Sequence, residues 1–191
     1  MARFGLNRAE QFGGQGGAGF FGLKGRKEAH IRFLYDDVSD VEGYAVHEIE
    51  LNGKKRYVDC LRGEHDGVNK CPLCREGEWV QVKYFVPVYD EDLRQVLTWD
   101  RGKTFGRRLE KLFEKYAAEE PLCSTCFTVT KEVNDEGTTS LSIKPDYNDG
   151  AELDEFPEYT TQVYGTLVLK KTTEEIEEYL EYGDFYDEDA C

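Results

Sequence analysis

The stretch HEIELNGKKRYVDCLRGEHDGVNKCPLC, residues 47–74, combines a hairpin signal with two histidines and three cysteines. Asn52-Gly53 within it is the strongest short-range signal for a two-residue β-turn. We therefore expect paired strands over GYAVHEIEL and KKRYVDCL, on either side of this turn. Such a hairpin brings His47 and Cys60 to its open end, beside the cysteine pair that follows.

The spacing of these side chains predicts a zinc site. It reads His47-x12-Cys60-x10-Cys71-x2-Cys74, and structural zinc takes four nitrogen or sulfur donors in a tetrahedron. Pro72 between the last two cysteines favours a tight knuckle in which both sulfurs reach one ion. We therefore expect one structural Zn²⁺ ion, held by His47, Cys60, Cys71 and Cys74.

Spacing alone leaves three alternatives open. His65 lies between the cysteines and offers a different nitrogen ligand. Cys123-x-x-Cys126 is a second pair that can join Cys71 and Cys74 in a Cys₄ site, a pattern typical of zinc ribbons. The third alternative is a chain without metal. If Cys123 and Cys126 bind no metal, we expect buried thiols, since free cysteine behaves as a small hydrophobe.

The rest of the chain favours a mainly β fold. Further strands are predicted over IRFLY, EWVQVKYFVPVY, RQVLTWD, CFTVTKEV, TTSLSIKP and YTTQVYGTLVL. KTFGRRLEKLFEKYAAEE, residues 103–120, has apolar residues at helical spacing and predicts one internal helix. Five or six strands with one helix suit an OB-fold barrel, with the zinc residues as an insertion.

Composition divides the chain into three parts. Residues 1–29 are glycine-rich and more basic than acidic, which predicts a flexible basic arm. Residues 30–171 are expected to form the OB-fold core, with a zinc subdomain at about 44–78. Residues 172–191 hold nine acidic and no basic residues, which predicts an acidic C-terminal tail; 173–182 within it favours a terminal helix.

Charge and hydropathy restrict the compartment and the partners. The net charge of −15 argues against nucleic acid when taken alone, but residues 1–115 contain 20 basic and 19 acidic residues, so the excess is C-terminal. The sequence contains no apolar run of membrane-spanning length and no signal segment. We therefore expect a cytoplasmic protein with reduced thiols and no membrane partner.

Basic and aromatic residues interleave in the near-neutral part of the chain. This mixture binds single-stranded nucleic acid, because cations follow the phosphates and aromatic rings stack on bases. Strand alternation places about half of such aromatics in the core, and Phe85 and Phe105 are the expected core members. The candidate DNA-binding residues are Lys54, Lys55, Arg56, Tyr57, Lys83, Tyr84, Trp99, Arg101, Lys103, Arg107, Arg108 and Lys111.

The order of these features resembles the phage gene 32-type single-stranded DNA-binding proteins. The resemblance covers about residues 12–130 and rests on the His-Cys-Cys-Cys spacing, the aromatic strand after it, and VLTWDRGKTFGRRLEKLF. QFGGQGGAGFFGLKG and GYAVHEIE are similar to smaller relatives of that family. The resemblance implies zinc ligation by the same four residues within an OB-fold, and a basic helix, FGRRLEKLF, beside the DNA cleft. The chain departs from the family by one extra residue between the second and third ligands, and by an arm without a dense cluster of basic and hydroxyl residues.

By this resemblance the protein coats single-stranded DNA in phage DNA replication, recombination and repair, in the cytoplasm of the infected bacterial host. Self-association on the DNA is a further expectation. The acidic tail is expected to recruit replication proteins, such as polymerase, helicase or primase, through Tyr179, Tyr182, Phe185 and Tyr186. The alternative is a zinc-ribbon adaptor, or a binding module associated with RNA or transcription. No catalytic pair stands out, so an enzyme is not expected.

Overall fold

The computed structural model describes residues 19–35, 40–62, 70–116, 122–133, 139–146 and 158–185. They form a mainly β protein, as the sequence predicted. In chain order the elements are β1 (Glu28–Phe33), β2 (Glu42–Leu51), β3 (Lys54–Asp59), α2 (Pro72–Arg75), β4 (Val80–Asp90), β5 (Gln95–Gly102), α3 (Lys103–Tyr116), β6 (Phe127–Val133), β7 (Thr139–Pro145), β8 (Val168–Leu169) and α4 (Thr173–Tyr182). None of the helices in the described ranges is long and apolar enough to cross a membrane.

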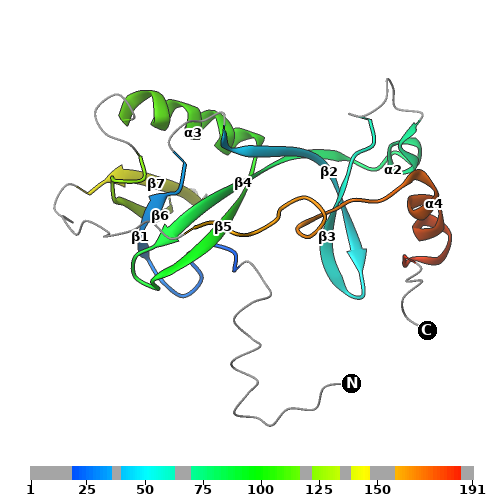
Figure 1. The fold of residues 1–191 in the computed structure, drawn as a ribbon, viewed down its shortest axis with the longest axis horizontal. Coiled ribbons are helices and arrows are strands. Elements are labelled where there is room, and N and C mark those ends of the chain that lie inside the picture. The colour runs from blue at the N-terminus through cyan, green and yellow to red at the C-terminus, as the bar shows by residue number, and fades with distance from the viewer. Residues whose placement is uncertain are drawn as a thin grey trace, which may run out of the picture.

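All eight strands belong to one sheet, which is built around β4. The order is β7-β6-β1-β4-β2-β3-β8, and β5 pairs with β4 outside this path. The first half of β4 pairs with β2, its last residues pair with β1, and β5 lies along its other edge. Figure 1 shows an elongated molecule, with α3, β6 and β7 towards one end and α2 and α4 at the other.

The β2–β3 hairpin has the turn that the sequence predicted. Asn52 and Gly53 both have positive φ, 52° and 70°, a backbone conformation that asparagine and glycine adopt most readily. The register pairs Leu51 with Lys54 across the turn and runs unbroken to Val46 and Asp59. The hairpin therefore holds its open end, where the predicted metal ligands lie, at a fixed position beside β4.

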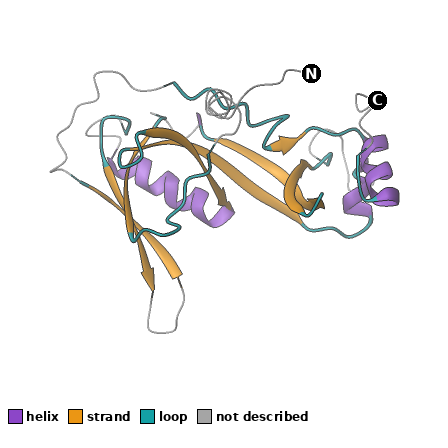
Figure 2. Cartoon of the chain, turned by 90° about the horizontal axis from the view of Figure 1, so that it is seen from below, coloured by secondary structure: helices purple, strands orange, loops and turns teal. Residues whose placement is uncertain are grey.

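Helix α3 covers the largest core of the molecule (Figure 2). It buries four side chains at helical spacing, Phe105, Leu109, Leu112 and Phe113. Against them lies Trp99, which is fully buried, with its ring centroid 4.8 Å from those of both Phe21 and Phe105. The predicted helix and the predicted burial of Phe105 are confirmed. Phe85 is also fully buried, but in a separate cluster with Val46.

Beside this core the sheet does not close between β5 and β7 in the described residues. Helix α3 connects β5 to β6, and β6 pairs with β1 on one side and β7 on the other. Among the described residues, no pairing joins β5 to β7. The end of β5, the start of α3 and the β6–β7 hairpin are therefore left to line a cavity, which is described below.

The predicted basic arm, residues 1–29, extends less far into the chain than expected. Phe20 forms a parallel β-bridge with Thr98, and the backbone N–H of Phe21 donates to the carbonyl of Thr98 at 2.9 Å. The Phe21 side chain is buried. Residues 19–29 therefore belong to the folded body, because an apolar anchor and backbone hydrogen bonds hold them to β5. Residues 1–18 lie outside the described residues.

The chain from residue 172 onward, which the sequence assigned to an acidic tail, folds onto the body over its described part, residues 172–185. Helix α4 starts with a capping box, in which Thr172 Oγ1 accepts from the N–H of Glu175 and the Glu175 carboxylate accepts from the N–H of Thr172. Ile176 is fully buried in a cluster with residues of the metal-ligand region. Residues 172–185 are thus a structural element, and 186–191 lie outside the described residues.

Candidate metal centre and cationic cavity

The four predicted metal ligands meet at the open end of the β2–β3 hairpin. His47 lies in β2, where that strand pairs with both β3 and β4. Cys60 follows β3 directly, and its N–H donates back to β2. Cys71 caps the N-terminus of the four-residue helix α2, and Cys74 lies within that helix. Two strands and one short helix therefore deliver one histidine and three cysteines to a single point.

The distances within this cluster fit one metal ion. All four ligand atoms lie within 4.8 Å of one another. His47 Nε2 is 3.4 Å from both Cys71 Sγ and Cys74 Sγ, and Cys60 Sγ is 3.6 Å from Cys74 Sγ. Metal–sulfur bonds of about 2.3 Å and metal–nitrogen bonds of about 2.0–2.1 Å separate tetrahedral ligands by roughly 3.6–3.8 Å. The cluster therefore can hold one ion at its centre.

All four residues of the cluster are buried, and burial controls its protonation. Burial lowers the pKa of His47 below its ordinary value, although the backbone of Trp79 acts in the opposite direction. Burial raises the pKa of Cys60 to about 12, and the hydrogen bond with Cys74 adds to the increase. An ion that binds here must displace thiol protons, so binding and proton release are coupled. The neutral imidazole favoured by burial is the form that binds metal.

Arg62 supports the negative charge that a metal-bound cluster would carry. Its Nη2 lies 3.3 Å from Cys74 Sγ. Three thiolates and a divalent ion leave one net negative charge, and a guanidinium beside a thiolate offsets it. His65, the alternative nitrogen ligand, lies outside the described residues; His47 fills the nitrogen position of the cluster.

The Cys₄ alternative is not what the structure forms. The cluster found within the described residues contains neither Cys123 nor Cys126. Cys126 is buried at the start of β6, as expected for an inert thiol, whereas Cys123 is only partly buried. The two pairs share a spacing, but only Cys71 and Cys74 lie beside the open end of the hairpin. Proximity to other donors, not the C-x-x-C motif itself, distinguishes the pair that can bind metal.

Two of the four C-terminal aromatic residues predicted to bind a partner, Tyr179 and Phe185, pack within the chain. Tyr179 and Phe185 stack on each other with ring centroids 5.2 Å apart and pack against the buried cluster at this end. The Tyr179 hydroxyl donates to the carbonyl of Glu50 at 3.1 Å. Tyr182 is 71% exposed and free to contact another molecule. Tyr186 lies outside the described residues.

A second candidate site is a cavity of about 640 Å³ where β5 ends and α3 begins. The β6–β7 hairpin and the segment before β1 complete its wall. Among the described residues, five that line it are cationic and none is acidic; the cations are Lys24, Arg101, Lys103, Arg108 and Lys131. In a chain with a net charge of −15, this concentration of positive charge requires an explanation.

The cavity cations have no acidic partner within the part of the chain that the structure describes. Among the described residues, none of the five forms an ion pair, whereas Arg26, Arg32 and Lys83 each pair with a carboxylate. The Arg101 guanidinium lies over the rings of Trp99, at 4.9 Å, and Phe105, at 5.6 Å. Burial lowers the pKa of Arg101 from its usual range, but arginine remains charged at any physiological pH. The cavity thus presents uncompensated positive charge, which suits an anionic ligand.

The structure separates the predicted DNA-binding residues into several groups. Arg101, Lys103 and Arg108 line the cavity. Arg107 and Lys111 are exposed on α3 outside it, and Tyr84 packs its ring against Gly106 of the same helix. The exposed residues Lys54 and Lys55 and the partly buried Arg56 lie on the β2–β3 hairpin, where Lys55 pairs with Glu48. The predicted DNA-binding residues therefore do not form one continuous surface.

Tyr57 and Lys83 of the predicted set are engaged with each other and with an acid. The Tyr57 hydroxyl donates to Asp100 Oδ2 at 3.0 Å, and Lys83 Nζ is 3.4 Å from Asp100 Oδ1. Lys83 Nζ also lies 4.7 Å from the centre of the Tyr57 ring. This network compensates the lysine charge internally, in contrast to the cavity cations.

Trp99, which was predicted to contact DNA, presents no accessible ring face in the structure. Trp99 is fully buried, because alternation along β5 directs Leu97 and Trp99 into the core and Thr98 to the opposite face. The accessible tryptophan is Trp79, which precedes β4 and is 80% exposed. Trp79 was not among the predicted DNA-binding residues, since neither of its immediate neighbours, Glu78 and Val80, is basic or aromatic. A lone tryptophan among glutamates was the only available signal.

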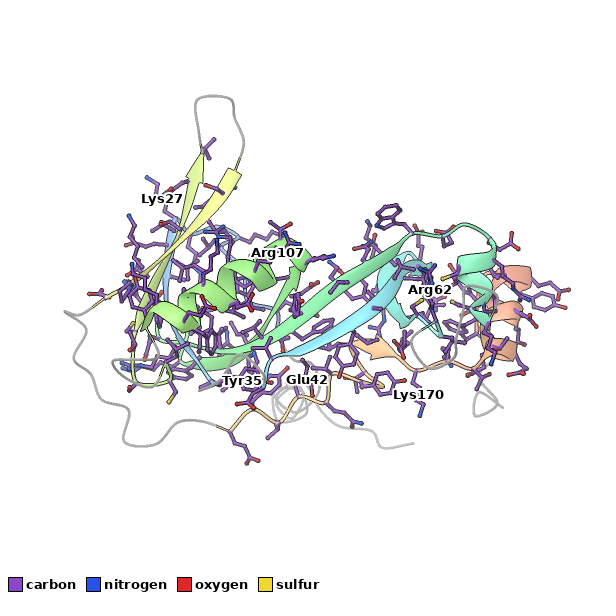
Figure 3. All side chains as sticks on the ribbon, turned by 90° about the horizontal axis from the view of Figure 1, so that it is seen from above. Lys27, Tyr35, Glu42, Arg62, Arg107 and Lys170 are labelled. Atoms are coloured by element: carbon purple, nitrogen blue, oxygen red, sulfur yellow. The ribbon has the colours of Figure 1, made fainter. Side chains whose placement is uncertain are left out.

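Residues 158–169, here called the crossing segment, cover the face of β4 and β5 opposite α3. The Tyr159 hydroxyl is 2.9 Å from Thr98 Oγ1, and the Tyr164 ring stacks on Tyr44 at 5.8 Å. Val163 and Val168, from the same segment, complete the cluster that buries Phe85. Figure 3 shows Glu42 and Lys170 along the side where this segment runs, with Arg107 on α3 across the sheet. The crossing segment thus removes one face of the sheet from solvent.

No protein-family model matches this chain, and a comparison with curated proteins finds no match to it.

Proposed function

We propose that the protein binds single-stranded nucleic acid, with single-stranded DNA as its principal ligand. The observation that carries this proposal is a cavity whose described lining has five cations and no acid, in a strongly acidic chain. Cations without internal partners destabilise a fold through mutual repulsion, so we infer that they serve an external polyanion. Phosphates in a row supply the negative charge that such a surface lacks.

The strand order supports an OB-type barrel as the framework. β1, β4 and β5 pair in succession, α3 follows, and the β6–β7 hairpin returns to pair with β1. This is the sequence of elements of a five-stranded OB-fold, a class that binds oligonucleotides. In this interpretation β2, β3 and α2 are inserted between the first two barrel strands. Between β5 and β7, which do not pair in the described residues, the barrel remains open.

Two surfaces are candidates for the ligand: the face of β4 and β5 that the crossing segment covers, and the cationic cavity. OB-folds commonly bind oligonucleotides on the outer face of their second and third strands, which correspond to β4 and β5. Here the crossing segment occupies that face and buries Phe85 completely. We therefore place the nucleic acid in the cationic cavity instead. A flexible single strand can insert its phosphates into this recess, whereas a rigid duplex presents them on a convex surface.

The metal centre supplies structure in this proposal, not chemistry. Three sulfurs and one imidazole nitrogen are a donor set that zinc takes in structural sites, and we propose one Zn²⁺ ion. Four protein ligands complete its tetrahedron and leave no position for a reactive water. His47, Cys60, Cys71 and Cys74 would hold the ion. Its role is to fix the hairpin and α2 in place, and we propose no enzymatic activity.

The biological setting remains a proposal from the sequence resemblance. A phage protein that coats single-stranded DNA during replication, recombination and repair agrees with the cationic cavity and the proposed metal. Exposed acids of α4, such as Glu174 and Glu181, and the exposed ring of Tyr182 offer a surface for replication proteins. A zinc-ribbon adaptor is the competing proposal, and it makes no use of the cavity.

Fluorescence anisotropy with labelled oligo-dT and a duplex of equal length tests this function. We expect tighter binding to oligo-dT, and an affinity that falls with salt at a log–log slope of about −0.7 for each phosphate contacted. Equal and weak binding to both ligands, with no salt dependence, would reject nucleic-acid binding and favour the adaptor. Stronger binding to the duplex would reject the single-strand assignment alone.

A further inference from the structure

Helix α4 packs against the segment that contains the candidate metal ligands Cys71 and Cys74. Helix α2 has four residues, begins at the ligand Cys71 as its N-cap and contains the ligand Cys74. A helix this short has no independent stability, so its conformation depends on what holds its two cysteines. Leu73, between them, is 2% exposed and belongs to the same cluster as Ile176 of α4. The position of α4 is thus built directly on the cysteine loop.

Helix α4 docks on this segment through contacts of several kinds. Ile176 is fully buried in a cluster that includes three ligand cysteines. Glu177 forms an ion pair with Arg75 at the end of α2, and Tyr179 donates to Glu50 of β2. The ring of Phe185 closes over Tyr179 and lies 4.6 Å from Lys171 Nζ. These contacts all join α4 to the metal end of the molecule.

We propose that metal binding and the docking of α4 are coupled, so that the ion controls whether this acidic helix is held or released. Without the ion, three buried thiols and a buried imidazole have nothing at their centre, and α2 loses the bonds that shape it. The apolar site in which the Ile176 side chain is buried is then lost. Coupling between two equilibria is reciprocal, so a docked α4 must retain the ion by the same factor. This inference rests on the metal centre of the proposed function and not on nucleic-acid binding.

Release changes what the C-terminal region presents. Docked, α4 places Ile176 and Tyr179 against the body and holds its acids at the end of the molecule away from α3 (Figure 1). Released, a ten-residue helix is too short to persist alone in water. It becomes an extended acidic segment with exposed apolar side chains. The ion therefore controls whether residues 172–185 are docked on the body or free to contact another molecule.

Two measurements test the coupling in the full-length, zinc-loaded protein. In the first, amide hydrogen exchange is compared before and after a chelator removes the ion. We expect amides of 175–183 to exchange at least tenfold faster in the chelated protein, while those of β5 keep their protection. Unchanged exchange in α4 after chelation would overturn the proposal, since the helix would then dock without the ion.

The second measurement follows metal release to a chromogenic chelator in α4 variants. Ile176→Asp removes the buried anchor, and Leu180→Asp is the matched control, because Leu180 is 40% exposed on the same helix. We expect Ile176→Asp to release zinc about tenfold faster, within the usual range of coupling, and Leu180→Asp to release it at the parental rate. Ile176→Ala, with an intermediate increase, replaces Ile176→Asp if that variant fails to fold.

The outcomes distinguish this inference from the proposed metal centre. Equal release rates for the parental protein and the Ile176 variants would contradict the coupling while leaving the metal centre intact. If the parental protein retains no zinc after purification and reconstitution, the metal centre fails, and the coupling fails with it. Global loss of protection on chelation, including β5, would show that the ion stabilises the whole fold and would reject a local switch.

Discussion

The metal end and the cationic cavity organise polar groups in opposite ways. At the metal end His47, Cys60, Cys71 and Cys74 converge on one point and are buried together. Around the cavity the cationic side chains come from several elements and have no acidic partner among the described residues. The metal ligands need only a bound ion to satisfy them. The cavity cations need an anionic molecule to offset their charge.

This difference explains why mutations should act differently at the two ends. A change at the metal end removes a bond that the fold itself requires, so stability should fall. A change in the cavity removes a repulsive charge from the unbound protein, so binding should fall while stability is preserved or increases. The predictions below test this contrast, from the largest expected effect to the smallest.

Replacement of Cys74 by serine should have the largest effect. Structural zinc contributes about 10–16 kcal/mol of apparent binding free energy in small zinc domains, and three remaining ligands hold the ion far more weakly. We expect Cys74→Ser to lose zinc, as determined by elemental analysis, and to unfold at a lower temperature. Cys123→Ser is the matched control and should retain one zinc per chain. Loss of zinc in Cys123→Ser and its retention in Cys60→Ser would contradict the cluster described here.

Gly106→Ala should destabilise the protein although alanine is the better helix former. A Cβ atom at this position would lie 2.4 Å from Tyr84 Cε2, so the ring or the helix must shift. The steric cost of overpacking is about 1–3 kcal/mol, which exceeds the gain in helix propensity of about 1 kcal/mol. Chemical denaturation gives the difference, with Gly22→Ala as control, because no atom lies within 4 Å of a Cβ there. An increase in stability for Gly106→Ala would show that α3 does not need this close approach.

Trp79→Ala should weaken binding to single strands without affecting the fold. An exposed ring that stacks on a base contributes about 1–3 kcal/mol, and Trp79 is 80% exposed. We expect oligo-dT to quench the fluorescence of Trp79 and to leave that of the buried Trp99 unchanged. The Trp79→Ala variant isolates the Trp99 signal. An affinity of this variant equal to that of the parental protein would contradict the assignment of Trp79 to the ligand-binding surface.

His30 should give the smallest effect, seen only as a pH dependence. The hydrogen bond to Asp92 raises the pKa of His30 above its ordinary value of 6.5. Burial opposes ionisation of Asp92, but hydrogen bonds from the His30 side chain and backbone lower the pKa of Asp92 overall. Stability from the charged histidine is therefore present below pH 6.5 and lost as pH rises through the raised pKa. The contribution of Asp92 is present above its ordinary pKa of 3.8 and lost as pH falls through the lowered one.

The pair therefore stabilises the fold most at mildly acidic pH, between these two values. Both side chains are well exposed, so we expect less than about 1 kcal/mol. His30→Gln should reduce stability at pH 5.5 and leave it unchanged at pH 8.5, as measured by urea denaturation. An equal loss at both values would indicate that the ring acts through packing and not through its charge.

The parts of the molecule that were predictable depend on contacts close in sequence. Asn52-Gly53 determines the hairpin register, and the register brings His47 and Cys60 together, so the spacing predicted this cluster of candidate metal ligands while leaving His65 and the Cys₄ set as alternatives. The helix around Phe105 follows from periodicity in the same way. These signals are local, because turn geometry and side-chain spacing act over a few residues.

The parts that sequence reasoning missed depend on contacts between distant segments. The acidic composition of residues 172–185 indicated a tail, but Ile176 finds its seat on a cysteine loop about a hundred residues earlier in the chain. Alternation along β5 was visible, yet only the tertiary fold decides that the Trp99 face is the buried one. The crossing segment likewise covers Phe85 from a distant part of the chain.

Charge reversal in the cavity tests the central claim most directly. Lys103→Glu/Arg108→Glu is compared with Lys54→Glu/Lys55→Glu, which makes the same change in net charge on the β2–β3 hairpin, by titration with oligo-dT at several salt concentrations. We predict that the cavity variant loses most of its low-salt affinity and that its log–log salt slope is less steep by about 1.4, the value for two phosphate contacts, while its folding stability is retained. The hairpin variant should bind with a slope close to that of the parental protein. A cavity variant that binds like the parental protein, with the loss confined to the hairpin variant, would contradict the account.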